Sequence, residues 1–398
     1  SAEGLALMRL AEALLRVPDA QTAIALTADQ LGRADFSDAP DGGPHRMLAS
    51  LSSTAIALSK NFLPQEEAAG GLLSRLGSKT VVAATVRAIQ LLGRQFVLGR
   101  HIGEAIGQAQ SARRSQPTLR FSYDMLGEGA RTERDAQRYL ASYQKAIAAI
   151  AKGPRGDGPE HTDGISIKLS ALFSRCEDAQ RARVFAELVP RVIALVDAAA
   201  RADMNLTIDA EESDRLELSL DVFEPLAVRI AAEHPRWRGF GLAIQAYQTR
   251  ALEVVNEVAR IARAHHLQFM VRLVKGAYWD GEIKRAQVDG LPGYPVFTRK
   301  VHTDVSYLAC ARALIGHADV IYPQFASHNA ATVAAIAQMA RAANAKFEFQ
   351  RLHGMGEGVF REVLAANPVL PLRIYAPVGE HRDLLAYLPS NNLEAPPV

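Results

Sequence analysis

The sequence predicts an α/β fold in which a (β/α)8 barrel of the TIM type follows an all-helical N-terminal lobe. From residue 118 onward, short apolar runs alternate with amphipathic helical segments, the order that parallel strands joined by helical crossovers require. Charged or amide side chains follow every apolar run, as they do at the carboxyl ends of barrel strands, where active sites lie. A barrel uses about 250 residues. A chain of 398 residues therefore leaves room for an additional lobe.

The first 117 residues show only helical patterns. One helical run stops at Pro18, Asp19 can cap the next, and residues 33–46 form a linker by composition. Because no basic recognition helix stands out, we expect a helical lobe that packs on the barrel and no nucleic-acid partner. The expected domains are a helical lobe at residues 1–117, a barrel at residues 118–388 and a tail at residues 389–398.

Eight strands, with helices between them, are expected in the barrel. The clearest strand lies in QFMVRLVKGAYWD, residues 268–280, whose apolar run is typical of a strand buried on both faces. The expected strands are residues 118–124, 165–171, 206–212, 240–247, 269–276, 320–328, 347–354 and 372–379. The expected helices lie near residues 131–151, 178–201, 214–232, 249–265, 298–315, 329–343 and 356–366.

Charge balance and cysteine content argue against several classes of protein. Lys plus Arg number 45 and Asp plus Glu number 43, a net charge of +2, so no overall field favours nucleic acid. Cys176 and Cys310 are the only cysteines, which excludes a disulfide framework or thiolate metal cage and favours a reducing, cytoplasmic compartment without a metal site. The sequence shows neither an uncharged apolar run of about 18 residues nor a signal segment, so neither a membrane span nor secretion is expected.

Functional side chains follow all eight expected strands. They are Asp124, Lys168, Asp209 with Glu211 and Glu212, Gln245, Arg272 with Lys275, His328 with Asn329, Gln350 with His353, and Tyr375. Any single one could equally be a solvated loop residue or a salt-bridge partner, but the eight sets converge on one barrel mouth. With Tyr278, Trp279 and Leu352 as apolar walls, they predict a pocket for a large planar ligand and a small polar one.

Three further patterns leave alternatives open. HGMGEG at 353–358 could hold a phosphate or only form a turn, and FTRKVHT at 297–303 could bind a pyrophosphate or start a solvated helix. Lys168 or Lys275, desolvated at the barrel mouth, could form a Schiff base, which would make the chain a lyase or aldolase. Asp209 could be a general base or could pair with Lys168.

Several motifs together resemble the proline dehydrogenase family. They are SIKLSAL, TIDAEE, AIQAYQ, RLVKGAYWD, FTRK, FASHN, EFQRLHGMGE and RIYAPVG, and the resemblance runs from residue 3 to residue 388. The helical stretch EGLALMRLAEALLRVPDA is similar to the bifunctional bacterial branch of that family.

The resemblance implies an FAD-dependent enzyme that oxidises L-proline to pyrroline-5-carboxylate by hydride transfer to the flavin and passes the electrons to a quinone. The FAD would bind without a covalent link at the carboxyl end of a distorted barrel. The catalytic residues implied are Arg272 beside flavin N5, Lys168 and Asp209. The other cofactor contacts implied are Asp209, Gln245, Val274, Lys275, Gly276, Ala277, Trp279, Thr298, Lys300, Thr303, His328, Asn329 and Gln350. The proline site implied consists of Lys168, Asp209, Tyr278, Leu352 and Tyr375.

Quinone use implies at most peripheral contact of a cytoplasmic protein with the inner membrane. The sequence predicts no oligomeric state.

The chain departs from the family pattern after Tyr387, where the resemblance implies a helix with two arginines that grip the substrate carboxylate. Pro389 ends this helix, and Ser390 and Asn391 stand at the arginine positions. Because Lys168 alone would then face the carboxylate, we expect bound flavin with weak proline affinity. A non-catalytic flavin-binding protein is the remaining alternative.

Overall fold

A computed structural model describes residues 96–154 and 156–379 of the chain. The chain divides into two compact units, Ser1–Gln95 and Phe96–Val398. The expected helices and linker of the first unit lie outside the described residues, as do Ser390 and Asn391.

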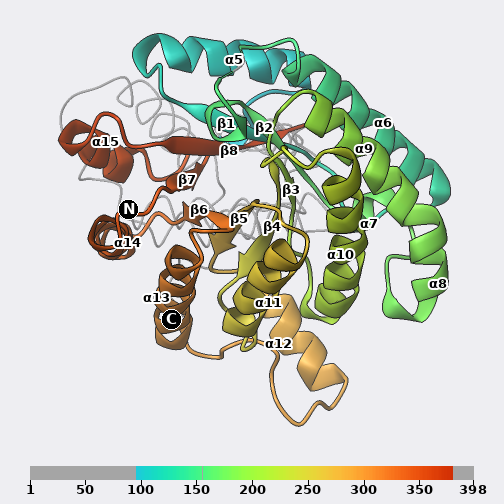
Figure 1. Cartoon of the computed structure of the whole chain (residues 1–398). Helices are drawn as coiled ribbons and strands as arrows, with labels where there is room; N and C mark the ends of the chain where they lie inside the picture. The colour runs from blue at the N-terminus through green and yellow to red at the C-terminus, as the bar shows by residue number, and fades with distance from the viewer. Residues whose placement is uncertain (1–95, 155, 380–398) are drawn as a thin grey trace, which may run out of the picture. The chain divides into compact units, whose positions relative to one another are not determined.

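The described residues form a closed barrel of eight parallel strands in sequence order, and β1 pairs with β8 to close it (Figure 1). The strands are β1 Arg120–Met125, β2 Gly164–Ile167, β3 Leu206–Ile208, β4 Phe240–Gln245, β5 Phe269–Val274, β6 Ile321–Ala326, β7 Glu348–Leu352 and β8 Leu372–Val378. The predicted (β/α)8 fold class is confirmed, and each expected strand overlaps an observed one.

Helices surround this barrel (Figure 1). The longer ones are α5 Ile102–Ser115, α6 Glu133–Ile150, α9 Val189–Arg201, α10 Leu216–Glu233, α11 Ala251–Ala264, α12 Trp279–Val288, α13 Lys300–Gly316, α14 Ala330–Ala342 and α15 Glu357–Ala366. The short α7 Leu169–Leu172 and α8 Arg181–Arg183 precede α9, and a π-helical turn at Val184–Leu188 joins α8 to α9. No helix of the described ranges is both long and apolar enough to span a bilayer.

The barrel strands are buried, and apolar side chains join them to the surrounding helices. All six residues of β4 are buried, and Phe240 stacks on Phe223 of α10 with ring centroids 4.7 Å apart. Phe269 of β5 meets the edge of Phe223 at 5.0 Å. Each fully buried phenylalanine contributes about 1.5–3 kcal/mol relative to an exposed one, so this helix–sheet contact is a large part of the core.

Several local expectations were wrong. The strand expected at residues 206–212 ends at Ile208. Residues 165–171 do not form one strand, because β2 ends at Ile167 and the backbone N–H of Ser170 turns to donate to Glu211 Oε2 at 3.1 Å. Helix α12 was not predicted because only Glu282 and Ala286 of it are buried, which leaves no apolar periodicity to recognise.

The segment before β1 belongs with the barrel. Leu98 N donates to Pro377 O at 2.9 Å, Gly379 N donates to Gly99 O at 3.0 Å, and α5 contacts β1 and β8. Part of the expected helical lobe at 1–117 therefore lies against the closing strands, while the domain boundaries themselves stay a prediction.

Candidate active site

A pocket opens at the carboxyl ends of the strands, with about 950 Å³ of empty space that includes open solvent at its mouth. Its lining comes from most of the barrel strands and from the loops that follow them: Glu128, Lys168, Asp209, Ala210, Ala243, Gln245, Arg272, Val274, Lys275, Gly276, Ala277, Tyr278, Ala326, Ser327, His328, Gln350, Arg351, Leu352 and Tyr375. Because parallel strands all point their carboxyl ends to one side, residues far apart in sequence meet here.

Lys168, directly after β2, is held between two carboxylates. Its Nζ lies 3.0 Å from both carboxylate oxygens of Asp124 and 3.6 Å from Asp209 Oδ2. Burial alone would lower the pKa of Lys168, but the charges of Asp124 and Asp209 outweigh it and raise that pKa well above its ordinary value. The lysine is therefore a fixed cation at the pocket wall.

Arg272 of β5 is fixed by side chains of four other strands or strand ends. Its Nε donates to Gln350 Oε1 at 2.7 Å and its Nη1 donates to Asp209 Oδ1 at 2.6 Å. Its Nη2 donates to Ser122 Oγ at 3.0 Å and to Ser166 Oγ at 2.9 Å. With 2% of its surface exposed, this guanidinium has little freedom to reorient.

Tyr375 of β8 connects to the same group. Its hydroxyl donates to Asp209 Oδ2 at 2.7 Å, and its ring lies against the Arg272 guanidinium at 4.8 Å. Asp209 thus receives hydrogen bonds from both Arg272 and Tyr375 and sets their relative position.

The loop after β5 is shaped around a glycine. Gln245 Oε1 accepts from Ala277 N at 3.0 Å, and Gln245 Nε2 donates to Glu211 O at 2.8 Å. Gly276 adopts φ +144°, and a Cβ there would lie 2.4 Å from the Tyr247 ring. Only glycine fits this position, because its backbone lies directly against the Tyr247 ring.

Two lysines share a carboxylate beside this loop. Lys275 Nζ lies 2.7 Å from Asp304 Oδ1, and Lys300 Nζ lies 2.8 Å from Asp304 Oδ2. Burial alone would raise the pKa of Asp304, but hydrogen bonds from both lysines outweigh it and lower that pKa. The pair offers an excess positive charge next to the pocket.

Sequence reasoning did not single out Glu128, which lies in the loop after β1 and lines the pocket. The Tyr278 hydroxyl lies 3.4 Å from Glu128 Oε2. Burial raises the pKa of Glu128 to about 7, with nearby carboxylates adding to the effect and Lys168 opposing it. No local pattern marked this residue, because it stands in an irregular loop.

Ser122 and Ser166, which hold Arg272, were also not predicted. The sequence did contain a signal for them, because Ser122 stands two residues before Asp124 and Ser166 two residues before Lys168. Residues two apart in a strand lie on the same face, so both serines could have been predicted to face the barrel interior with those charges.

The structure brings thirteen of the predicted site residues to the pocket: Lys168, Asp209, Gln245, Arg272, Val274, Lys275, Gly276, Ala277, Tyr278, His328, Gln350, Leu352 and Tyr375. It places five others outside the lining: Trp279, Thr298, Lys300, Thr303 and Asn329. Trp279 Nε1 donates to Phe297 O at 2.8 Å and Asn329 Oδ1 caps α14. Thr298 is exposed, while Thr303 is buried in α13.

The pocket combines small apolar side chains with cationic ones. Among residues 96–154 and 156–379, no three His, Cys, Asp or Glu side chains are placed to hold a metal ion. Ala210, Ala243 and Ala326 contribute small apolar side chains to the pocket lining. Lys275 and Lys300 supply cations of the kind that anionic phosphates require.

Fold and site define the class: a parallel α/β barrel with a charged ligand pocket at its catalytic end. The chain belongs to the proline dehydrogenase family, since residues 107–390 match the family model described as "Proline dehydrogenase".

Individual relatives agree with this membership. The bifunctional protein PutA of Escherichia coli (strain K12) is 46% identical over 405 residues, which cover 99% of this chain and 30% of that protein. Proline dehydrogenase 1 of Bacillus subtilis (strain 168) is 26% identical over 312 residues, 77% of this chain and 88% of that protein. A crystal structure of a mutant proline utilization A (PutA) from Bradyrhizobium japonicum matches with a TM-score of 0.71 at 48% identity, covering 98% of this chain and 39% of that one. The chain thus spans less than a third of the length of the Escherichia coli relative.

A second family model, described as "DNA-binding domain of Proline dehydrogenase", matches residues 1–96. This match departs from our expectation that the chain has no nucleic-acid partner. The expectation rested on the absence of a basic recognition helix from residues 1–117. That absence is not decisive, because some DNA-binding domains contact DNA with β-strands instead of a helix.

Proposed function

We propose that this chain oxidises L-proline to pyrroline-5-carboxylate with a bound FAD. One observation carries the proposal: a single pocket joins a fixed lysine cation, a fixed arginine and two tyrosines around a cavity with small apolar floor residues. Membership of the proline dehydrogenase family supports the substrate and the reaction.

FAD would accept a hydride from the ring carbon next to the proline nitrogen. The residues that would hold it are Gln245, Arg272, Val274, Lys275, Gly276, Ala277, His328 and Gln350 in the pocket lining, with Lys300 beside them. Trp279, Thr298, Thr303 and Asn329 are proposed as further contacts on resemblance. Four hydrogen bonds keep the Arg272 guanidinium in place.

Proline would bind against the other side of the pocket. Lys168 neutralises the substrate carboxylate, while the apolar faces of Tyr278, Leu352 and Tyr375 confine the five-membered ring. Asp209 positions Tyr375 and Arg272 through hydrogen bonds of 2.7 and 2.6 Å. These residues bind and orient the reactants, which by itself removes much of the barrier to such a transfer.

The proposal includes weak proline affinity. Ser390 and Asn391 stand where the resemblance implies two arginines, so Lys168 is the cation left for the carboxylate. A steady-state KM for L-proline, compared with that of a variant carrying Ser390→Arg and Asn391→Arg, tests this part. An unchanged KM would contradict it.

The main test is the visible spectrum of the purified protein before and after anaerobic addition of excess L-proline. Flavin absorption bands that bleach with L-proline, but not with D-proline, support the proposal. Bands that persist at every L-proline concentration would favour the non-catalytic flavin-binding alternative. A colourless protein that FAD does not reconstitute would overturn the proposal.

The Schiff-base alternative is disfavoured by the carboxylates that lie beside its two candidate lysines. A lysine must lose its proton to attack a carbonyl, but Lys168 lies between Asp124 and Asp209, and Lys275 lies 2.7 Å from Asp304.

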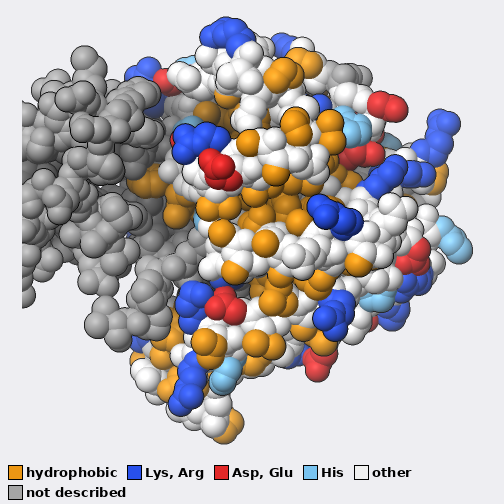
Figure 2. Space-filling model, turned by 90° about the vertical axis from the view of Figure 1, so that its left-hand side faces the viewer, with side chains coloured by type: hydrophobic (Ala, Val, Ile, Leu, Met, Phe, Trp, Pro, Cys, Tyr) orange, Lys and Arg blue, Asp and Glu red, His pale blue; other side chains and the backbone are white. Residues whose placement is uncertain are grey.

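Transfer of electrons to a quinone, and peripheral contact with the inner membrane by a cytoplasmic protein, remain part of the proposal by resemblance alone. DNA binding by residues 1–96 joins the proposal, because that stretch matches the model described as "DNA-binding domain of Proline dehydrogenase". Residues 1–96 contain nine basic and nine acidic residues, a net charge of 9 − 9 = 0, so any attraction to DNA phosphates would have to come from local clusters of basic side chains. On the barrel face seen in Figure 2, Lys and Arg side chains are scattered among apolar ones and form no basic stripe. A gel-shift assay of the whole chain at low salt, extended to moderate salt, would decide whether the family match carries DNA affinity.

A further inference from the structure

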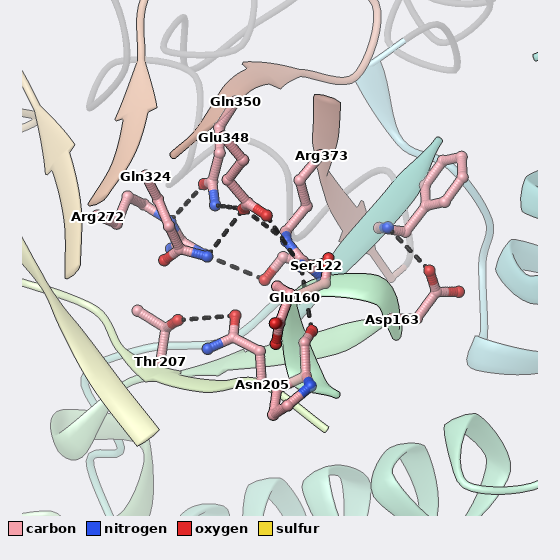
Figure 3. Close-up of polar contacts among 12 residues, drawn as sticks. Ser122, Glu160, Asp163, Asn205, Thr207, Arg272, Gln324, Glu348, Gln350 and Arg373 are labelled. Carbon is pink, nitrogen blue, oxygen red and sulfur yellow. Dashed lines mark hydrogen bonds and ion pairs between the residues drawn. The ribbon is translucent and has the colours of Figure 1, made fainter. Parts of the chain in front are cut away.

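Five buried polar side chains form a column from the pocket floor to the amino ends of the strands. This polar column consists of Arg272, Gln350, Glu348, Gln324 and Arg373, and none of the five is more than 2% exposed. Arg272 and Gln350 line the pocket, whereas Glu348 and Arg373 stand in the first two positions of β7 and β8. Figure 3 shows Gln350 and Gln324 pointing toward Glu348.

Glu348 is the shared acceptor of the polar column. Its Oε1 accepts from Gln350 Nε2 at 2.8 Å, from Gln324 Nε2 at 2.8 Å and from Arg373 Nε at 2.7 Å. Its Oε2 accepts from Arg373 Nη2 at 3.0 Å. All four partners are N–H groups, so both oxygens of Glu348 act as acceptors.

This carboxylate decides which way the Gln350 amide points. An amide has an NH2 end and an oxygen end, and only the NH2 end can face an ionised carboxylate. The oxygen end of Gln350 must then face the other way, where it accepts from Arg272 Nε at 2.7 Å. The reversed amide would set its NH2 group against the Arg272 N–H and its oxygen against Glu348.

We infer that Glu348 is a positioning residue for the reaction: through Gln350 it fixes the guanidinium of Arg272 at the pocket floor. The other bonds of Arg272 cannot replace this one, because they all involve its terminal nitrogens, and the two serine hydroxyls among their partners can rotate. The inference rests on the proposed function, in which the charge of Arg272 lies beside the flavin.

The decisive experiment compares Glu348→Gln with wild type in three measurements. These are the rate of flavin reduction by L-proline in a single turnover, the midpoint potential of the bound flavin, and the side-chain NH2 resonances of Gln350 in a ¹⁵N–¹H spectrum. The introduced amide no longer forces the orientation of Gln350. We expect the reduction rate to fall roughly 10- to 100-fold, as for a misplaced catalytic group, the potential to become more negative, and the Gln350 resonances to shift.

Two more variants keep the result interpretable. Glu348→Gln leaves the Arg373 charge less well paired and can fail to fold, so a double variant, Glu348→Met with Arg373→Met, removes both charges while still depriving Gln350 of its acceptor. It should show the same three changes. Gln324→Leu is the matched control, because Gln324 is buried and bonds the same Oε1 but, among the described residues, forms no hydrogen bond with Arg272 or Gln350. It should lower stability and leave the reduction rate and the potential at wild-type values.

Wild-type rates and potentials in a folded, flavin-bound Glu348 variant would overturn the inference. Equal losses in Gln324→Leu would also overturn it, because the polar column would then act only as packing. If L-proline fails to reduce even the wild-type flavin, the proposed function fails separately. The potential and the Gln350 resonances then still decide the role of Glu348 by the same comparison.

Discussion

The ammonium of Lys168 lies 3.0 Å from both carboxylate oxygens of Asp124, whose side chain is fully buried beneath it. Asp209 approaches the same ammonium from the pocket side at 3.6 Å. Lys168 is therefore held from below and can meet a ligand only from the pocket. This arrangement favours the proposed role of Lys168, a cation that binds a carboxylate, over that of an amine that attacks a carbonyl.

Replacement of Lys168 by methionine should destabilise the protein by about 3–5 kcal/mol, because it leaves Asp124 as a buried, unpaired charge. The double variant Lys168→Met with Asp124→Leu should recover most of that loss, since both charges are then gone. Neither variant should bind L-proline as wild type does. Urea denaturation measures the first two effects, and a spectral titration with L-proline measures the third. Wild-type affinity in the double variant would contradict the role given to Lys168.

Lys168 should also resist reductive alkylation. Because its pKa is raised well above the ordinary value, the side chain stays protonated and is a poor nucleophile at neutral pH. After treatment with formaldehyde and borohydride, peptide mapping should find modified Lys145 and Lys284, which are exposed, and unmodified Lys168. An adduct on Lys168 in the folded protein would revive the Schiff-base reading.

The positions of the strands could be predicted because parallel strands buried on both faces leave apolar runs that are visible in one sequence. Residues 269–276 and 372–379 were found this way, each within two residues of the observed strand. The strand-end charges Lys168, Asp209 and Arg272 could be predicted for the same reason, because barrel topology turns their sequence positions into one site.

The remaining parts of the site depend on tertiary contacts that no local pattern carries. Glu128 stands in an irregular loop and reaches the pocket only through the path of that loop. Glu348 is the first residue of β7, and nothing in the local sequence distinguishes it from an ordinary polar residue at the start of a strand. Its proposed positioning role depends on hydrogen bonds from Gln324 of β6 and Arg373 of β8. The five predicted residues outside the pocket lining came from resemblance, and their roles stay predictions.

Gly276→Ala should reduce both stability and flavin content. The backbone at φ +144° is strained for alanine by about 1–3 kcal/mol. In addition, the new Cβ would lie 2.4 Å from the Tyr247 ring, which is itself fully buried. The ratio of flavin to protein absorbance and the thermal midpoint measure the two effects.

Gly281→Ala is the matched control. Gly281 lies in α12, and no neighbouring atom lies within 4 Å of a Cβ placed there. Alanine at such a helical position should be neutral or stabilise by roughly 0.5–1 kcal/mol. Equal flavin loss in both variants would show that the loop does not depend on the conformation of Gly276.

Glu128 should make the stability of the substrate-free protein depend on pH. Burial raises its pKa in the folded state to about 7, from an ordinary value of 4.5. Between these two values the folded protein holds a proton that the unfolded chain has released, so the free energy of unfolding falls as pH rises. The fall amounts to at most about 3 kcal/mol and ends above pH 7, where both states are ionised.

Urea denaturation of wild type and Glu128→Gln at several pH values from about 4.5 to 8 measures this dependence. Burial lowers the pKa of His353 to about 4 from an ordinary value of 6.5, so His353 makes an opposite contribution that rises with pH below 6.5. The Glu128 contribution is therefore the difference between the two curves, and the stability of wild type relative to Glu128→Gln should fall across the window, because the variant side chain cannot ionise. Glu253→Gln, at an exposed position on α11, should keep the wild-type pH dependence. If Glu128→Gln keeps it as well, the titrating group is another residue, and the buried carboxyl facing Tyr278 is ionised throughout.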